Sequence, residues 1–560
     1  TDGGTTTEDG TTTDDGTTTA DGTTTADGTT DGGTTDGGTT TDDGTTTDGG
    51  TTTDDGTTST TGEPGELVMT LVGRYESGIF DSSGAEISAF DPASMRLFVV
   101  SAGAGTVEVL DLADPSAPTF VQSIAMANGG SPNSVDVHDG VVAVAVEAAD
   151  LQAPGQVQFF APDGTSLAAV TVGALPDMLE FSPDGSRVVV ANEGEPDQSY
   201  TVDPEGSISI VDMTVGVDLL TDDDVVTAGF SAFDLAMLDP SVRVFGPGAT
   251  AAQDFEPEYV AIAPDGATAW VTLQENNALA IVDLVAGEVT DVVGLGWKDH
   301  SVAGQGLDPS DDDDAIAIAS WPVSGLYLPD AVAAFSAGGE TFLVTANEGD
   351  ARDYDAFGEE TRIEDLVLDG TAFPDAAALQ ASEALGRLRV TSTLGDVDDD
   401  GDHDQLYSFG GRSISVWNAD GSLAWDSGDG LEQAVAAALP DEFNSNNTAN
   451  DSFDSRSDDK GPEPEGVAVA DLFETTYAFV GLERIGGIAA FDLADPQSPV
   501  LVTYVNDRDF TGDPELGTAG DLGPEGLLVI SAADSPNETP LLVVAHEVSG
   551  TVAVYELALR

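Results

Sequence analysis

The sequence predicts an all-β protein, a seven-bladed β-propeller with a low-complexity segment before it. Two observations support this fold class. From about Glu66 onward, short β-branched runs alternate with Gly, Asp and Pro, which is typical of many small antiparallel strands. In that region a unit of two strands recurs seven times. Its early copies are about 45 residues apart, the length of a four-stranded propeller blade.

Residues 1–62 contain almost only Thr, Asp and Gly in a loose repeat, such as Thr5–Gly10. They have no apolar side chain larger than alanine, so they cannot build a core that offsets the entropy of folding. We expect a disordered tether with a root-mean-square span of roughly 45 Å. Threonine glycosylation and weak calcium binding by its Asp residues are the alternatives to a plain solvated linker.

Six of the seven repeat units enter the first strand at a Pro-X pair, with an acid at X in five of them and Asn133 in the sixth, and six end the second strand at or near a Glu. The two loosest copies cover 87–101 and 132–147. The five clearest copies begin at Pro176-Asp177, Pro257-Glu258, Pro329-Asp330, Pro464-Glu465 and Pro524-Glu525. These units predict a YVTN- or WD40-like ring, and a strand from Leu67 to Tyr75 would supply the last blade's missing fourth strand and close it.

We expect this propeller to cover residues 63–560, with insertions at about 213–255, 300–328 and 355–463. The last insertion contains one expected helix, from Asp375 to Leu388.

The repeat places acids in turns at one end of each blade. These turns surround the central channel, so we expect a ring of carboxylates on one rim, whose mutual repulsion calls for cations. Oxygen ligands from several loops suit Ca²⁺ first, with Mg²⁺ or Mn²⁺ as alternatives. Otherwise the carboxylates only order the rim by accepting hydrogen bonds from loop N–H groups. The expected metal ligands of the ring are Glu193, Glu195, Glu258, Glu275, Glu348, Asp350, Glu465, Glu483, Glu525 and Glu547.

A separate calcium site is expected in the longest insertion. Residues 396–404 match the first nine positions of a calcium-binding loop, with Gly401 at the sixth position for the sharp turn. The twelfth position is Tyr407 and not the usual bidentate Glu. The expected ligands are Asp396, Asp398, Asp400, Asp402 and Asp404. The alternative is a solvated acidic turn.

Basic residues are scarce and lie close to acids in the sequence. The only two lysines are expected in loops between blades. On a metal-bearing rim, basic side chains would suit phosphoester hydrolysis, because metal activates water and cations take up phosphoryl charge. The alternative is that each base is the salt-bridge partner of a neighbouring acid. The candidate catalytic residues are Lys298, His300, Arg352, Lys460 and Arg484.

The charge restricts the partners of the chain. It has 103 Asp and Glu against 15 Lys and Arg, a formal net charge of −88, which excludes electrostatic attraction to nucleic acid or anionic lipid. There is no cysteine, hence no disulfide or thiolate metal site. The sequence has no transmembrane-length apolar stretch and begins at Thr1, so we expect a processed, secreted form.

Several long segments resemble a known family. They include residues 345–354, 452–466, 481–487 and 520–526, and together such segments cover nearly all of residues 67–560. They resemble the choice-of-anchor I family. The resemblance implies a secreted or surface-anchored bacterial propeller, similar to a cell surface glycoprotein of calcified sea urchin skeletons and often labelled alkaline-phosphatase-like.

We therefore expect an extracellular or cell-surface module, anchored through the N-terminal tether, that binds divalent cations. Its further partners would be extracellular matrix, mineral or a neighbouring copy. One alternative is a metal-dependent phosphoesterase acting on a phosphate ester at the channel rim. The other is a subunit of a surface layer or extracellular filament.

Overall fold

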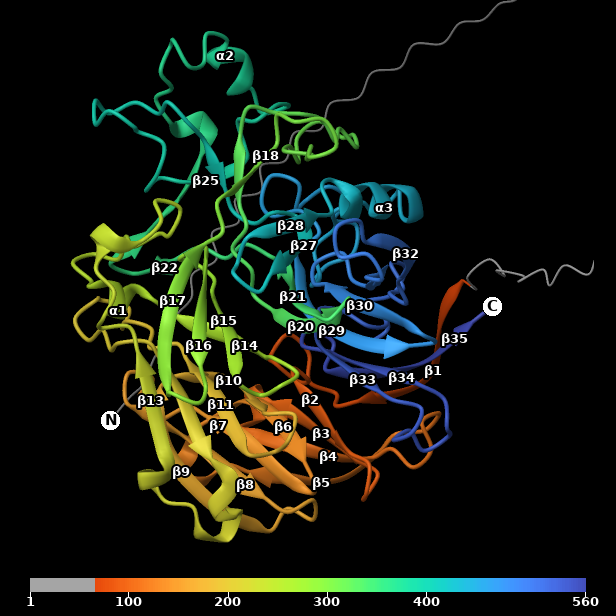
Figure 1. The fold of residues 1–560 in the computed structure, drawn as a ribbon. Helices are drawn as coiled ribbons and strands as arrows, with labels where there is room; N and C mark the ends of the chain where they lie inside the picture. Colours follow the sequence, from red (N-terminus) through yellow and green to blue (C-terminus); the bar gives the residue numbers. More distant parts are fainter. Residues whose placement is uncertain (1–65) are drawn as a thin grey trace, which may run out of the picture. The chain divides into compact units, whose positions relative to one another are not determined.

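The computed structural model describes residues 66–560, which form an all-β protein built mainly of four-stranded antiparallel sheets (Figure 1). The predicted tether, residues 1–62, lies outside the described residues. Within residues 66–560, no helix combines the length and the apolar character that crossing a membrane requires.

Seven of the sheets in the described part have four strands, and most are formed by strands consecutive in the sequence. The first four sheets are β2 (Ser88–Asp91), β3 (Arg96–Ser101), β4 (Thr106–Asp111) and β5 (Thr119–Ala125); β6 (Pro132–His138), β7 (Val141–Val146), β8 (Pro154–Phe160) and β9 (Ser166–Ala174); β10 (Pro176–Phe181), β11 (Arg187–Asn192), β12 (Ser207–Asp212) and β13 (Val225–Gly229); and β14 (Pro257–Ile262), β15 (Thr268–Leu273), β16 (Ala278–Asp283) and β17 (Glu288–Gly294). The last three are β20 (Val332–Ala337), β21 (Glu340–Asn347), β27 (Ser413–Asn418) and β28 (Leu423–Asp426); β29 (Pro464–Leu472), β30 (Thr475–Leu482), β31 (Ile488–Asp492) and β32 (Val500–Val505); and β33 (Pro524–Ile530), β34 (Leu541–His546) and β35 (Thr551–Leu559) with β1 (Leu67–Glu76).

One edge strand of each four-stranded sheet packs against the corresponding strand of the next sheet. β2 contacts β6, and the contacts continue through β10, β14, β20, β29 and β33, which in turn contacts β2. Residues in or next to all these strands line a shared cavity of about 330 Å³. Sheets arranged around such a channel are characteristic of a β-propeller.

Both faces of each sheet are buried between neighbouring sheets, as β11 illustrates. Val188 and Val190 pack with Val157 of the preceding sheet, whereas Val189 packs with Val260 of the following one. Successive side chains of a strand point to opposite faces, so a strand buried on both sides is a continuous apolar run. This explains the uninterrupted valines of the repeat.

β1 is the outer strand of the last sheet. It pairs antiparallel with β35, from Leu67 opposite Leu559 to Glu76 opposite Thr551. Its buried side chains, Leu67 and Met69, belong to a core shared with residues of β30 and β34. The strand expected at residues 67–75 is therefore present, and it joins the two ends of the described chain.

The ranges expected to be insertions contain strands of the main sheets. Residues 213–255 include β13, and residues 355–463 include β27 and β28. The long insertion therefore leaves the fifth sheet between its second and third strands. A five-stranded sheet combines strands of the long insertion with two earlier strands. Its order is β18 (Trp297–Asp299), β19 (Ser324–Leu326), β26 (Tyr407–Ser408), β25 (Arg389–Thr391) and β24 (Glu360–Arg362). A separate hairpin consists of β22 (Asp353–Tyr354) and β23 (Phe357–Gly358). In Figure 1, β18 and β25 stand at the top, away from β5 and β8.

In the described part of the chain, the α-helices are α1 (Ala251–Asp254), α2 (Ala376–Leu379) and α3 (Gly430–Ala438). The helix expected from Asp375 to Leu388 is wrong in length, because only α2 forms there. The chain then turns so that the fully buried Leu385 and Leu388 reach a small core with Ile363. Tertiary packing of these leucines outweighs local helix propensity.

Candidate cation-binding rim

Four of the repeat's leading acids, the residues after the first prolines, sit at irregularities in strand pairing. In β10, β14, β29 and β33 the pairing with the second strand shifts just after the proline, and such bulges re-aim the side chain of an unpaired residue. The residues concerned are Asp177, Glu258, Glu465 and Glu525. Three of them, with Asp330 just before β20, line a cavity of about 140 Å³ at the end of the channel.

The closing glutamates, which follow the second strands, lie at the same end of the sheets. In three sheets, the proline that begins the first strand (β10, β29 or β33) pairs with the last residue of the second strand. A glutamate directly follows that last residue. These closing glutamates are Glu193, Glu483 and Glu547. Strand register thus brings the two acidic positions of the repeat together on one rim, as the sequence predicts.

In one part of the rim the carboxylates form no ion pair within residues 66–560, although Arg352 is close enough to act on Glu275. Glu258 and Glu275 are each only 7% exposed, and the Oε2 atom of each has no hydrogen-bond partner within residues 66–560. The Oε2 atoms of Glu465 and Glu525 likewise lack a partner there. Burial raises the pKa of Glu275 to about 7 although Arg352 opposes the shift. Burial and then the neighbouring Glu275 raise the pKa of Glu258 well above its ordinary value.

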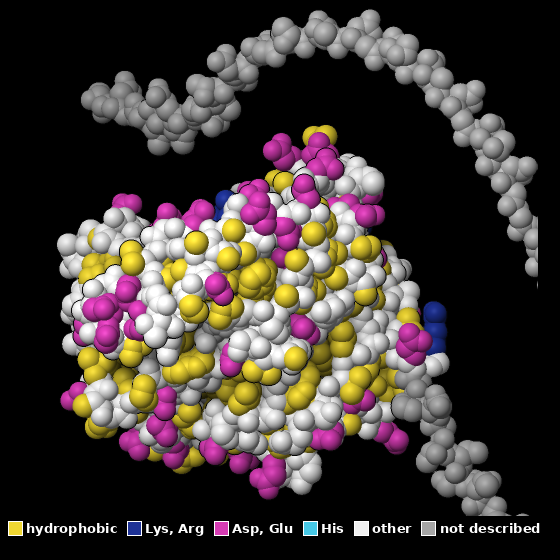
Figure 2. Space-filling view, turned by 90° about the horizontal axis from the view of Figure 1, so that it is seen from above, with side chains coloured by type: hydrophobic (Ala, Val, Ile, Leu, Met, Phe, Trp, Pro, Cys, Tyr) yellow, Lys and Arg dark blue, Asp and Glu magenta, His cyan; other side chains and the backbone are white. Residues whose placement is uncertain are grey.

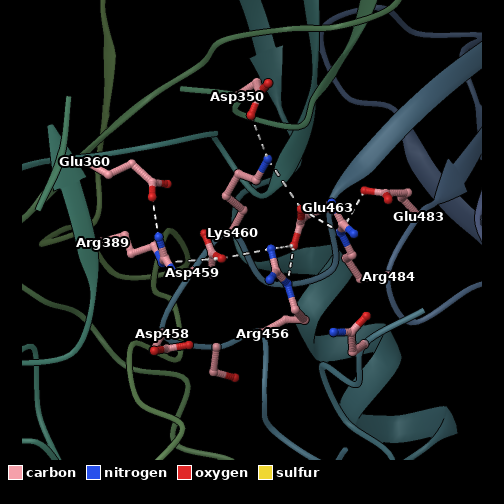
Figure 3. A network of polar contacts seen from close by, with 12 residues as sticks. Asp350, Glu360, Arg389, Arg456, Asp458, Asp459, Lys460, Glu463, Glu483 and Arg484 are labelled. Carbon is pink, nitrogen blue, oxygen red and sulfur yellow. Dashed lines mark hydrogen bonds and ion pairs between the residues drawn. The ribbon is translucent and has the colours of Figure 1, made fainter. Parts of the chain in front are cut away.

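The other part of the rim carries its own cations (Figure 3). Carboxylate oxygens of Glu348, Glu463 and Glu483 lie within 4.8 Å of one another. Lys460 Nζ is 2.9 Å from Glu348 Oε1 and 3.5 Å from Glu463 Oε2. Arg484 Nε is 2.9 Å from Glu483 Oε2 and 3.1 Å from Glu463 Oε2.

Glu463 is the centre of this compensated cluster. Arg456 Nη2 is a third cation beside it, 2.7 Å from its Oε1. Burial alone would raise the pKa of Glu463, but Lys460, Arg456 and Arg484 lower it to about 2. Glu463 is therefore an ionised carboxylate balanced by one ammonium and two guanidinium groups. Burial and then the charge of Glu463 raise the pKa of Glu483 well above its ordinary value.

Three predicted ligands lie at the edges of these two groups. Glu195 accepts a hydrogen bond from the Tyr354 hydroxyl at 3.0 Å, and Asp350, with a side chain 56% exposed, is 3.3 Å from Lys460 Nζ. Burial raises the pKa of Glu547, although the charge of Arg484 opposes the shift.

Lys298 and His300 belong to a different environment. Lys298 lies in β18 and not in a loop, and its buried Nζ donates to the carbonyl oxygens of Gly411 at 2.8 Å and Gly428 at 2.6 Å. Burial lowers the pKa of His300, whose Nδ1 is 2.6 Å from the Gln305 carbonyl oxygen. In the described part of the chain, no hydrogen bond or ion pair joins either side chain to the rim carboxylates.

Arg352 is held by acids from the segment before β14. It is 2% exposed, with Nη1 2.5 Å from Asp254 Oδ1 and Nη2 2.8 Å from Glu256 Oε2.

Of the five candidate catalytic bases, only Lys460 and Arg484 therefore contact the Glu348–Glu463–Glu483 cluster. Four of the five, all but His300, form ion pairs with acids.

The predicted calcium loop groups three of its five acids. Oxygens of Asp396, Asp398 and Asp404 lie within 4.8 Å of one another, whereas Asp400 and Asp402 are not part of that group. Asp396 caps the turn by accepting the N–H groups of Asp400 at 3.1 Å and Gly401 at 3.0 Å. The negative charge of Asp400 raises the pKa of Asp398.

Sequence reasoning missed Glu463, Arg456 and the pair Asp254 and Glu256. A signal for two of them was present, because Glu-Pro-Glu occurs at both 256–258 and 463–465. In each, the first Glu is buried against arginine and the second is a leading acid of the rim. Arg352 comes from a distant segment, 96 positions after Glu256, and leaves no local pattern, whereas Arg456 lies only seven positions before Glu463.

Comparisons with known proteins give a family match and two relatives. Residues 86–496 match the choice-of-anchor I domain. Gigasin-3a of Magallana gigas is 36% identical over 194 residues, 32% of this chain and 67% of its own length. The mesenchyme-specific cell surface glycoprotein of Strongylocentrotus purpuratus is 30% identical over 308 residues, 48% of this chain but only 38% of its own length.

Among solved structures, two align with this chain at low sequence identity. The WD40 domain of Toxoplasma gondii coronin is 9% identical, with coverage of 89% of this chain and 88% of the coronin chain and a TM-score of 0.45. Hydrazine synthase of Kuenenia stuttgartiensis is 13% identical, with coverage of 86% and 97% and a TM-score of 0.44.

Proposed function

Because the chain belongs to the choice-of-anchor I family, we propose that it is an extracellular or cell-surface β-propeller whose rim binds divalent cations, Ca²⁺ before Mg²⁺ or Mn²⁺. In this proposal the seven four-stranded sheets are blades of one ring, closed where β1 pairs with β35. The cell surface glycoprotein among its relatives supports the location. Bound cations would link the rim to matrix, mineral or a neighbouring copy.

The observation that carries the proposal is the set of unpartnered carboxylate oxygens on Glu258, Glu275, Glu465 and Glu525. An ionised carboxylate can only accept, and burying it without a partner costs several kcal/mol. A hard divalent cation bound by oxygen ligands removes this cost. The molecule has few cations of its own to offer, and in Figure 2 Lys and Arg are sparse among the many acids of the visible face.

The distribution of bases favours one part of the rim. Lys460, Arg456 and Arg484 already neutralise the cluster around Glu463. Glu258 and Glu275 are buried, repel each other, and have Arg352 as a neighbour that is itself paired with Asp254 and Glu256. We therefore assign the first rim cation to Glu258 and Glu275 and their acidic neighbours.

The loop that contains Asp396, Asp398 and Asp404 supports a second, more exposed calcium site. Its three carboxylates converge, and no ion pair within residues 66–560 joins them to a basic side chain.

Equilibrium dialysis against calcium, followed by elemental analysis, tests the proposal. The double variant Glu258→Gln, Glu275→Gln should lose one bound ion, whereas the exposed Glu288→Gln on β17 should lose none. Anomalous scattering from crystals grown with Mn²⁺ would locate the ion. Equal calcium content in the double variant and the unmodified protein would contradict the assignment.

Phosphoester hydrolysis is the second candidate, supported only by the closeness of Lys460 and Arg484 to Glu348 and Glu483. These bases are already engaged with carboxylates, and the other three candidate bases contact different groups. We therefore expect no hydrolysis of p-nitrophenyl phosphate at alkaline pH. Chelator-sensitive turnover that is lost in Glu348→Gln would favour the enzyme instead.

A further inference from the structure

A buried polar cluster lies outside the rim, between the acidic loop 308–314 and the segment that follows α3. Its members Asp308, Asn444 and Asp454 are 0%, 0% and 1% exposed. The cluster also contains Glu432 of α3 and Ser457, which are equally buried. None of these residues belongs to the rim or to the loop at 396–404.

Asn444 and Asp454 meet at the hydroxyl of Ser457. Asn444 Nδ2 donates to Ser457 Oγ at 2.9 Å, and Ser457 Oγ donates to Asp454 Oδ1 at 2.6 Å. Asn444 Nδ2 also donates to Glu432 Oε1 at 3.2 Å. An ionised carboxylate only accepts hydrogen bonds, so the atom of the Asn444 amide that contacts Glu432 is the nitrogen. The other atom of the amide, Oδ1, is therefore the one left for another partner.

Two oxygens of the cluster lack a partner. Asn444 Oδ1 and Asp454 Oδ2 are buried and have no hydrogen bond within residues 66–560. Both atoms belong to side chains that hydrogen-bond to the Ser457 hydroxyl, and both residues are at most 1% exposed. A carbonyl oxygen and a carboxylate oxygen both need a positively charged or hydrogen-donating partner.

The cluster has excess negative charge. Arg412 is the guanidinium bonded into it, 2.7 Å from Glu432 Oε1, and its other bonds are to the carbonyl oxygens of Asp308, Ser457 and Asp459. Arg412 thus offsets Glu432 and leaves the carboxylates of Asp308 and Asp454. The Asp308 carboxylate accepts the N–H groups of Ser310 at 3.4 Å and Ala317 at 2.5 Å, whereas Asp454 keeps an oxygen without a partner within residues 66–560. Burial raises the pKa of both carboxyls to about 7.

The backbone of Asn444 and of Asp454 has a positive φ angle. Asn444 and Asp454 have φ values of 45° and 67°, a left-handed conformation that Asn and Asp tolerate better than other side chains. The N–H of Asp454 bonds to the carbonyl of Phe443 at 2.7 Å, so the two turns are held side by side.

We propose that Asp308, Asn444 and Asp454 form a buried site for one hard divalent cation, with Ca²⁺ the best match to their oxygen-only ligand set. The site joins the 308–314 loop to the segment 441–459, which continues directly into Lys460 and Glu463 of the rim. An ion here therefore holds in place the segment that carries the rim's own cation.

The test is calcium stoichiometry by equilibrium dialysis, together with thermal unfolding in chelator and in calcium. Asp454→Asn preserves the shape but removes a charge, and it should lose one bound Ca²⁺ per chain and part of the calcium-dependent rise in Tm. Asp312→Asn, an exposed change in the same acidic loop, is the matched control and should retain both.

A second way to balance the cluster is a proton on Asp454 in place of a bound cation. The variant Asn444→Asp distinguishes these two possibilities. A cation site gains a carboxylate in this variant, so calcium binding should persist and the Tm should depend more steeply on calcium. Unchanged calcium stoichiometry in Asp454→Asn, with a Tm equal to or above that of the unmodified protein, would overturn the proposal in favour of the proton. The Glu258→Gln, Glu275→Gln variant keeps this site, so failure here is distinguishable from failure of the rim proposal.

Discussion

Lys460 and Glu348 form a buried ion pair across two neighbouring sheets, with Nζ 2.9 Å from Oε1. The lysine precedes β29 and the glutamate follows β21. Glu463 and Glu483 complete a carboxylate group around them. An ammonium group therefore occupies a cluster that would need a metal ion if it were entirely acidic.

Replacing Lys460 with methionine should convert this cluster into a metal site. Without metal the variant should lose about 3–5 kcal/mol of unfolding free energy, because the buried Glu348 loses its ion-pair partner. Arg456 and Arg484 still pair with the other two glutamates. Calcium should restore most of that stability and add one bound ion, as measured by chemical unfolding and dialysis. Arg96→Met, which breaks a partly exposed pair with Asp111, should cost under about 1 kcal/mol and gain no calcium response. Equal responses of the two variants would refute the prediction.

The rim should make stability depend on both pH and calcium. Burial raises the pKa of Glu275, and likewise of Asp177, to about 7, so the folded state favours their neutral forms. Their contribution is fully present below the unfolded-state pKa near 4 and is lost as pH rises through 7. It amounts to on the order of 3 kcal/mol for Glu275. In chelator, Tm should fall between pH 5 and 8, and calcium should reverse the fall. If the difference in Tm between calcium and chelator were the same at every pH, it would count against calcium binding at the rim.

Glu463→Gln should be strongly destabilising because three basic side chains lose their shared partner. We expect a loss of about 3–5 kcal/mol at neutral pH by chemical unfolding. The pKa of Glu463 is lowered to about 2, so its contribution is present above about pH 4.5 and disappears as pH falls toward 2. Glu360→Gln affects a pair with Arg389 in which both side chains are about one-third exposed, and it should cost under about 1 kcal/mol. A similar small loss in both variants would show that the cluster is not a stabilising network.

The loop at 396–404 should bind calcium without supporting the core. Asp398→Asn removes one of its three converging carboxylates and should reduce bound calcium by one ion. Because Asp398 is exposed, Tm in chelator should stay unchanged. Asp400→Asn, outside the converging group, should retain the ion. Identical calcium content in all three proteins would identify the loop as a solvated turn.

Leu67 and Leu559 face each other across β1 and β35 but should differ in importance. Leu67 is 2% exposed and Leu559 is 39% exposed. Leu67→Ala should cost about 2–5 kcal/mol by chemical unfolding, because it leaves a cavity in the core at the β1 strand. Leu559→Ala should cost under about 1 kcal/mol. Equal costs would mean that β1 is not required to hold the last sheet.

The sequence alone determined the repeated sheets and the acidic rim. A two-residue side-chain period and the short turns between strands set which residues are buried and which end of a sheet they reach, so Asp177 and Glu193 could be placed together from spacing. The strand at Leu67 was predictable for the same reason, since the last unit lacked a fourth strand.

Only the tertiary structure decided which of the acids are compensated. Arg352 binds Asp254 and Glu256 from almost a hundred residues away, and Lys460 reaches Glu348 across 112 positions. No local pattern encodes such pairs, because they depend on how the sheets and the long insertion pack. The same packing buried Lys298 and His300 away from the rim, shortened the helix at Asp375, and brought Asn444 and Asp454 together. The sequence thus established that the rim is acidic, and the fold determined where its charge is left for a cation to balance.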